Sequence, residues 1–302
     1  MANQQFVKDL IDAGIHFGHR TSRWNPKMKP YIYNRRNLIH IIDVRETLKG
    51  VIAAKRFLSR IIASGKDVVF VGTKRQARSV IEEVGKRTGM PFVAERWLGG
   101  TLTNYRTIRS RLQRFEELEA ILGSPDVSKN YSKKMEASLK REFRKIKRNL
   151  SGIRNMDRLP GVVFVVDVKR EIIAIKEARK LGIPVVALID TDSDPDDVDI
   201  AIPGNDDAMR AIELILKEIG DAVIEAKAGR QAKEDAPAPG EGPGGGRRDR
   251  GGRRRPTSVQ TEEAAAAEKP QPIEPAPVAA APAAAPAPVP TAAPEETTST
   301  PA

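Results

Sequence analysis

The residue types most suited to a chemical role gather in residues 13–47. Two histidines, His16 and His19, stand there among cationic and aromatic side chains. Those side chains are Phe17, Arg20, Arg23, Trp24, Lys27, Lys29, Tyr31, Tyr33, Arg35 and Arg36. Because cations neutralise phosphates and flat rings stack on unpaired bases, this mixture is typical of RNA binding.

Two prolines bear on the conformation of this stretch. Pro26 and Pro30 lack an amide donor and disfavour the helical region in the residues before them, so we predict an extended arm over residues 13–47 rather than a helix. An arm without a core of its own must lie on the following domain or on a partner. The alternative is that the aromatic side chains only attach a long loop to the protein surface.

A second candidate site consists of Thr73, Lys74 and Arg75, which follow the apolar run DVVFV and precede a helical pattern. The junction between a strand and a helix is where open α/β sheets bind phosphates. The residues fit neither the dinucleotide-binding pattern G-x-G-x-x-G nor the P-loop pattern. We therefore assign them to a backbone phosphate of RNA and not to a nucleotide.

An acidic turn over residues 190–197 follows the last apolar run. It departs from the EF-hand calcium pattern at the required glycine and glutamate positions, so that kind of site is excluded. One interpretation is a solvated turn whose carboxylates cap backbone amides. The other is that His19, Asp190 and Asp206 converge at the C-terminal edge of a sheet and bind Mg²⁺ or Zn²⁺.

The histidines do not form a recognisable catalytic arrangement. His16 and His19 have no neighbouring glutamate of the kind found in zinc proteases, and His40 lies in a predicted strand, where a structural role is expected. Cysteine is absent, which removes disulfides, thiol nucleophiles and cysteine-based zinc sites. We expect no enzymatic activity, no small-molecule substrate and no required cofactor.

The net charge and hydropathy of the 302-residue chain point to the class of partner. The formal net charge of +11 favours a polyanion. No apolar run approaches the roughly 18 residues that cross a bilayer, and the first residues are not a signal peptide. We expect a cytoplasmic protein without a membrane partner.

Strand and helix patterns alternate along most of the chain, which predicts an α/β fold with three layers and a mostly parallel, flavodoxin- or Rossmann-like sheet. The expected strands are residues 38–42, 67–71, 90–93, 162–166, 184–189 and 200–203. The expected helices are residues 44–63, 76–88, 171–181 and 206–227. The α/β domain would thus comprise residues 1–104 and 159–227.

Two segments stand apart from this domain. In residues 105–158 apolar residues recur every three or four positions on either side of a polar turn, which predicts an inserted helical coiled-coil hairpin that protrudes from the sheet. Residues 105–159 also carry 15 Lys and Arg against seven Asp and Glu. Residues 228–302 are rich in Ala, Pro and Gly with few large apolar residues, so we expect a disordered tail.

Seven blocks of sequence, in order, resemble the family of the second protein of the bacterial small ribosomal subunit. They are GIHFGHRTSRWNPKMKPYIY, HIID, VGTKRQA, ERWLGGTLTN, VVFVVDVKRE, EARKLGIPVVALIDTDSDPD and IPGNDDA. The resemblance extends over residues 6–227 and omits the tail. It implies an α/β sheet sandwich with a protruding helical coiled coil.

The resemblance also implies a structural role in binding small-subunit ribosomal RNA between the head and the body, on the solvent side. Other small-subunit proteins are implied partners, and the chain would help to recruit ribosomal protein one. Residues in matching motifs that suit RNA contact are His16, His19, Arg20, Trp24, Asn25, Lys27, Lys29, Thr73, Lys74, Arg96, Trp97, Thr101 and Asn104. Arg23 and Arg75 join them because of their charge.

Two other classes of function are compatible with the residues. One is a nucleotide- or metal-dependent enzyme built on the doubly wound sheet, which tight stoichiometric binding of ATP, GTP or NAD would indicate. The other is an adaptor whose helical hairpin binds a protein. The positive charge and the absence of reactive groups favour the RNA-binding interpretation.

Overall fold

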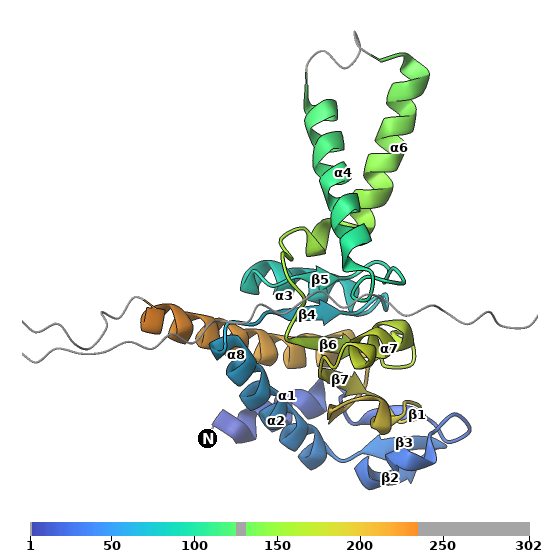
Figure 1. Cartoon of the computed structure of the whole chain (residues 1–302). Helices are drawn as coiled ribbons and strands as arrows, with labels where there is room; N and C mark the ends of the chain where they lie inside the picture. The colour runs from blue at the N-terminus through green and yellow to red at the C-terminus, as the bar shows by residue number, and fades with distance from the viewer. Residues whose placement is uncertain (1, 125–130, 235–302) are drawn as a thin grey trace, which may run out of the picture. The chain divides into compact units, whose positions relative to one another are not determined.

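The computed structural model describes residues 2–124 and 131–234, and Figure 1 shows their arrangement along the chain. No helix in these two ranges is long and apolar enough to cross a membrane. The proposed disordered tail lies outside the described residues, apart from residues 228–234.

A five-stranded parallel sheet forms the centre of the fold. Its strands, in spatial order, are β5 (Phe92–Val93), β4 (Val68–Val71), β6 (Val162–Val166), β7 (Val185–Ile189) and β8 (Ile200–Pro203). β4, β6 and β7 are buried at every position, as expected for valine-rich parallel strands with helices on both faces. This confirms the predicted mostly parallel α/β sheet.

Alternate residues of the central strands enter two different cores. Phe70 and Phe164 lie on one face, where α2 (Val44–Ala63), α3 (Arg78–Thr88) and α8 (Met209–Glu234) cover them. The other face forms the second core, which is covered by α7 (Ile172–Lys180) and by the sheet-proximal ends of two helices from the inserted segment. The sheet is therefore the middle layer of three, which fits the predicted Rossmann-like class.

Residues 13–47 form more regular structure than an extended arm, and the prediction for this stretch is corrected. After α1 (Ala2–Asp12), three short strands make a separate antiparallel sheet in the order β1, β3, β2. Their bounds are Phe17–Arg20 for β1, Ile32–Arg36 for β2 and Ile39–Ile42 for β3. The strand expected at residues 38–42 thus exists, apart from its first residue, but it does not belong to the parallel sheet.

Local geometry explains that correction. Asn37 and Leu38 have φ angles of 49° and 61° and form the two-residue turn between β2 and β3, where a positive φ at both positions matches the twist of a hairpin. The 3₁₀ helix η1 (Pro26–Tyr31) precedes β2. Pro26 is accepted there because the first helical position needs no amide donor, and Asn25 remains extended as predicted.

The inserted segment contains α4 (Tyr105–Gly123) and α6 (Lys133–Leu150), which lie side by side (Figure 1). Phe115 and Phe143 stack between them with ring centroids 5.3 Å apart. The buried positions of α4 follow the predicted helical spacing and are Ile108, Leu112, Phe115 and Leu118. Of the turn predicted at residues 123–126, residues 125 and 126 lie outside the described residues.

The last helix differs from its prediction at both ends. α8 begins at Met209, because Asn205 accepts hydrogen bonds from the backbone amides of Asp207 and Ala208 and holds a turn before it. It continues to Glu234, so residues 228–234 are helical where disorder was expected. The sequence AKAGRQAKE favours that extension because most of its residues have high helix propensity.

Candidate nucleic-acid interface

The cations of residues 17–36, in the antiparallel sheet, η1 and the loop between β1 and η1, are mostly free of carboxylate partners. Five of them are exposed and form no ion pair with any described residue: Arg20, Arg23, Lys29, Arg35 and Arg36. We call these five side chains, with Tyr33, the arm surface. Because no internal carboxylate neutralises them, these cations are available to phosphates.

Lys27 differs from its neighbours. Its Nζ lies 2.8 Å from Asp194 Oδ2 and 2.6 Å from Asp196 Oδ2. The hydrogen bond to Asp194, followed by that to Asp196, raises the pKa of Lys27 above its usual range. Lys27 thus attaches η1 to the acidic turn. Some carboxylates of this turn therefore form ion pairs, in addition to those that cap backbone amides.

The aromatic side chains of residues 13–47 divide into two groups. Trp24 is half-buried with its ring 4.9 Å from that of His40, and Tyr31 packs against the second core. Tyr33 is 76% exposed and Phe17 is 48% exposed. Trp24 therefore packs within the segment and Tyr31 attaches the segment to the domain, so only Tyr33 and Phe17 present ring faces that a base could stack on.

Asn25 and His16 hold the segment in place. Asn25 Oδ1 accepts a hydrogen bond from the backbone amide of Lys27, and the amide of Asn25 donates to the carbonyl of Thr191 at 2.8 Å. The ring of His16 lies 4.1 Å from that of Phe17, and burial lowers the pKa of His16. His16 is therefore neutral near pH 7 and carries no charge for a phosphate.

Lys74 is surrounded by carboxylates. Its Nζ lies 2.7 Å from Asp206 Oδ1, 2.6 Å from Asp207 Oδ1 and 3.4 Å from Asp167 Oδ2. Burial would lower the pKa of Lys74, but the carboxylates, Asp206 first, outweigh burial and hold the pKa above its usual value. Its charge is satisfied within the protein, so the geometry does not favour the phosphate contact expected from the sequence.

Thr73 is also bonded internally. Its backbone amide and its Oγ1 both donate to Glu171 Oε1, at 2.9 and 2.5 Å, and Arg170 Nε donates to Thr73 Oγ1. Burial raises the pKa of the Glu171 carboxyl. Of the three residues in the predicted phosphate site, only Arg75 is exposed.

The loop over residues 96–104 is organised by a carboxylate that sequence reasoning missed. Glu177 of α7 accepts hydrogen bonds from Trp97 Nε1 and from the backbone amides of Gly100, Leu102 and Thr103, at 2.7–3.2 Å. Burial would raise the pKa of Glu177, but these donors hold it below its usual value. The available signal was a glutamate that shares the apolar face of a helix with Ala174 and Ala178.

The other predicted residues of this loop have unequal access to solvent. Trp97 and Thr101 are 6% and 2% exposed, so neither presents its side chain to a ligand. Arg96 and Asn104 are exposed. The loop therefore contributes two polar side chains to the surface and keeps the aromatic one inside.

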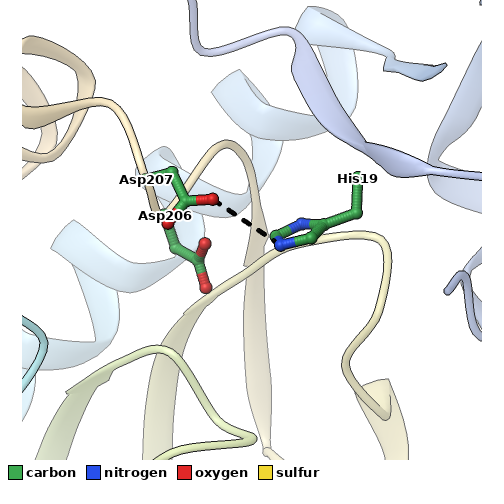
Figure 2. A group of neighbouring side chains, drawn as sticks. All are labelled: His19, Asp206 and Asp207. Atoms are coloured by element: carbon green, nitrogen blue, oxygen red, sulfur yellow. Dashed lines mark ion pairs between the residues drawn. The ribbon is translucent and has the colours of Figure 1, made fainter.

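A candidate cation site lies at the C-terminal edge of the parallel sheet. Figure 2 shows His19, Asp206 and Asp207 turned toward one another, and one ligand atom of each lies within 4.8 Å of the others. His19 Nε2 is 3.6 Å from Asp207 Oδ2. The structure thus brings together His19 and Asp206 as predicted, with Asp207 as an additional member.

Asp190 contacts the other side of the His19 ring. His19 Nδ1 and Asp190 Oδ2 are 2.9 Å apart, close enough for an ion pair, although their alignment does not meet hydrogen-bond geometry. The interaction with Asp190 outweighs burial and raises the pKa of His19 to about 9. Asp190 therefore orients the ring from behind and is not placed as a third ligand of the same cation.

Comparison with known proteins assigns the family. Residues 10–226 match the family described as ribosomal protein S2. The small ribosomal subunit protein uS2 of Rhodopirellula baltica is 59% identical over 237 residues, 78% of this chain and 90% of that protein. The protein of the same name from Thermus thermophilus is 51% identical over 223 residues, which are 74% of this chain and 87% of the Thermus protein. The chain therefore belongs to the ribosomal protein S2 family.

Proposed function

We propose that this small-subunit ribosomal protein binds ribosomal RNA through the arm surface. The observation that carries the proposal is the set of five exposed arginines and lysines without carboxylate partners among the described residues, beside the exposed ring of Tyr33. The cations would neutralise phosphates, and the ring would stack on an unpaired base. Arg75, Arg96 and Asn104 are further exposed contacts in the proposal.

The family supports a structural role. The relatives are named as proteins of the small ribosomal subunit and are not enzymes, so ribosomal RNA and other ribosomal proteins are partners of this chain. The finer parts of the proposal are binding between head and body of the subunit and recruitment of ribosomal protein one. We also propose that α4 and α6 pack as a short antiparallel coiled coil. The stacked rings of Phe115 and Phe143 support this packing.

Charge removal on the arm surface tests the RNA contact. The triple variant Arg20→Gln, Arg35→Gln and Arg36→Gln should bind small-subunit ribosomal RNA more weakly, with a salt slope of log K smaller by about 2–3 if each side chain neutralises one phosphate. The control removes three exposed charges elsewhere that form no ion pair with a described residue, with Arg56→Gln, Lys176→Gln and Lys217→Gln. Equal slopes for the two variants would refute the assignment.

Recruitment of ribosomal protein one has a separate test. A chain in which residues 105–158 are replaced by a short linker is incorporated into subunits, and the retention of ribosomal protein one on those subunits is measured. Loss of ribosomal protein one with normal incorporation would support an adaptor role for α4 and α6. If ribosomal protein one were retained at the normal level, α4 and α6 would have no part in its recruitment.

We also propose that His19 Nε2, Asp206 and Asp207 hold a divalent cation. Lys74 contacts the Oδ1 atoms of both carboxylates, whereas Asp207 turns its Oδ2 toward His19. The cation would lie beside the lysine and would displace the proton that His19 Nε2 carries near neutral pH. A nitrogen ligand with carboxylates favours Zn²⁺ over Mg²⁺. Bound there, the ion would tie β1 to the start of α8 as a structural link.

Titration with Zn²⁺ and with Mg²⁺ examines this site. The wild-type chain should bind one Zn²⁺, the variant His19→Gln should lose that binding, and the control His16→Gln should keep it. Binding that survives in His19→Gln, or that is absent in the wild type, would exclude the site.

A further inference from the structure

We propose that one face of α6 binds the sugar-phosphate backbone of double-stranded RNA. The face consists of Arg141, Arg144, Lys145 and Arg148, and we call it the α6 basic face. This inference rests on the proposed RNA-binding function but assigns a second site, with a different form of RNA, away from the arm surface.

Helical spacing brings the four side chains together. They stand at positions i, i+3, i+4 and i+7, which share one side of an α-helix and extend over about 10 Å of its axis. They line a cleft of about 420 Å³. The buried Leu139 and Leu150 of the same helix, and the stacked ring of Phe143, lie on the side that packs against α4 and the domain. The basic face is thus long enough to contact more than one phosphate.

No described carboxylate neutralises this face. α6 carries eight Lys and Arg against two Asp and Glu, and both glutamates have other partners. Glu136 pairs with Lys140, and Glu142 lies 3.5 Å from Arg114 Nε of α4. By contrast, cations elsewhere in the domain, such as Lys55 and Lys74, are held by carboxylates. Four adjacent unpaired charges therefore leave a strong local positive potential.

The absence of a stacking surface decides which form of RNA fits. Phe143 is the one aromatic residue of α6, and its ring is stacked on Phe115 and covered by Lys147 Nζ at 5.6 Å. Single-stranded RNA is recognised largely through stacking of its bases, whereas a duplex presents phosphates and its shape. A row of cations without a ring suits the duplex, and the arm surface with Tyr33 suits unpaired bases.

The test uses the full-length chain with two probes, a fully paired RNA hairpin of about 20 base pairs and an unstructured single strand with the same number of phosphates. The variant Arg141→Gln, Arg144→Gln, Lys145→Gln and Arg148→Gln should bind the duplex on the order of tenfold more weakly, with a salt slope smaller by about three. Its affinity for the single strand should change much less. The matched control carries Arg56→Gln, Lys176→Gln, Arg210→Gln and Lys217→Gln, four exposed and unpaired charges on other elements.

The outcomes separate this inference from the function on which it rests. A lost duplex affinity with intact single-strand binding supports the α6 basic face, and circular dichroism of the variant verifies that α6 is folded. Equal losses in variant and control show that only total charge matters and overturn the inference. If the arm-surface triple variant loses binding and the α6 variant does not, the second site is wrong and the proposed function stands. Loss of a protein contact alone would assign the face to an acidic protein and also overturn it.

Discussion

Glu177 accepts hydrogen bonds from five donor atoms of one loop, which include the indole of Trp97 and three backbone amides. A buried carboxylate with that many donors is charged and fixes its surroundings, because any other loop conformation would leave the charge without partners. The exposed Arg96 and Asn104 stand on this loop. Glu177, itself buried, therefore fixes the loop that carries these two candidate RNA contacts.

Glu177→Gln should lower the free energy of unfolding by about 2–3 kcal/mol at pH 7, because an amide group would face donors that the carboxylate accepts. The pKa of Glu177 is lowered in the folded state, so its stabilisation is complete above the unfolded-state pKa of about 4.3 and is lost as the pH falls through the folded-state value. Urea unfolding from pH 7 to pH 3 measures both effects.

The stability curves of wild type and Glu177→Gln should converge as the solution becomes acidic. The exposed Glu213→Gln on α8 is the control, and it should stay within about 0.5 kcal/mol of the wild type. If the difference in unfolding free energy between wild type and Glu177→Gln stayed constant down to pH 3, the shape of the side chain, and not its charge, would hold the loop.

At the scale of elements, α4 and α6 share a narrow apolar contact and reach the second core only at one end. Ile108, Leu112 and Leu150 belong to that core, whereas Phe115 and Phe143 lie outside it and stack on each other. Arg154 also lies over the Phe115 ring at 5.4 Å. The stability of the helix pair beyond the core thus depends on few side chains, which suits an element that presents charge rather than one that builds the domain.

Phe115→Ala should therefore act locally. Phe115 is 3% exposed, and truncation of a buried phenylalanine costs about 3–5 kcal/mol. We expect amide hydrogen exchange to accelerate in α4 and α6 while β6 and β7 keep their protection. Met135→Ala, at a 51% exposed position of α6, serves as the control with little effect. Equal acceleration in the central strands would show that the helix pair and the sheet unfold as one unit.

At the scale of the whole molecule, the chain divides into two units, residues 1–241 and residues 242–302. Residues 242–302 contain seven Lys and Arg and seven Asp and Glu, so they contribute nothing to the net charge of +11. The family match ends at residue 226, within the first unit. The positive field that attracts a polyanion is therefore a property of residues 1–241.

A chain that ends at residue 241 should keep both its thermal midpoint and its salt-dependent affinity for small-subunit ribosomal RNA. Calorimetry and filter binding over a series of salt concentrations measure the two quantities against the full-length chain. A drop of tenfold or more in RNA affinity would show that residues 242–302 take part in binding in spite of their balanced charge.

Sequence alone determined the elements whose signals are local. The valine-rich runs of β6 and β7, the bounds of α2 and the helical spacing of α4 appear where they were predicted, and Gly89 ends α3 with a φ of 65°. The buried face of α2 is Val51, Leu58 and Ile62, not the face of Leu48, Ile52 and Ile61 that the sequence favoured. The family was also recognisable from its motifs. These features depend on residues close together in the chain, so the pattern of a short window is sufficient to predict them.

Tertiary structure alone decided which charged side chains are free. Lys74 and Asp206 are 132 positions apart, and Glu177 and Gly100 are 77 apart, yet each pair is in hydrogen-bond contact. The sequence predicted Lys74 as a phosphate ligand from its charge and its place after a strand. Neither feature shows whether a distant carboxylate packs against the lysine in the folded chain. Availability to RNA is a non-local property, and only the folded chain separates the paired cations from the arm surface and the α6 basic face.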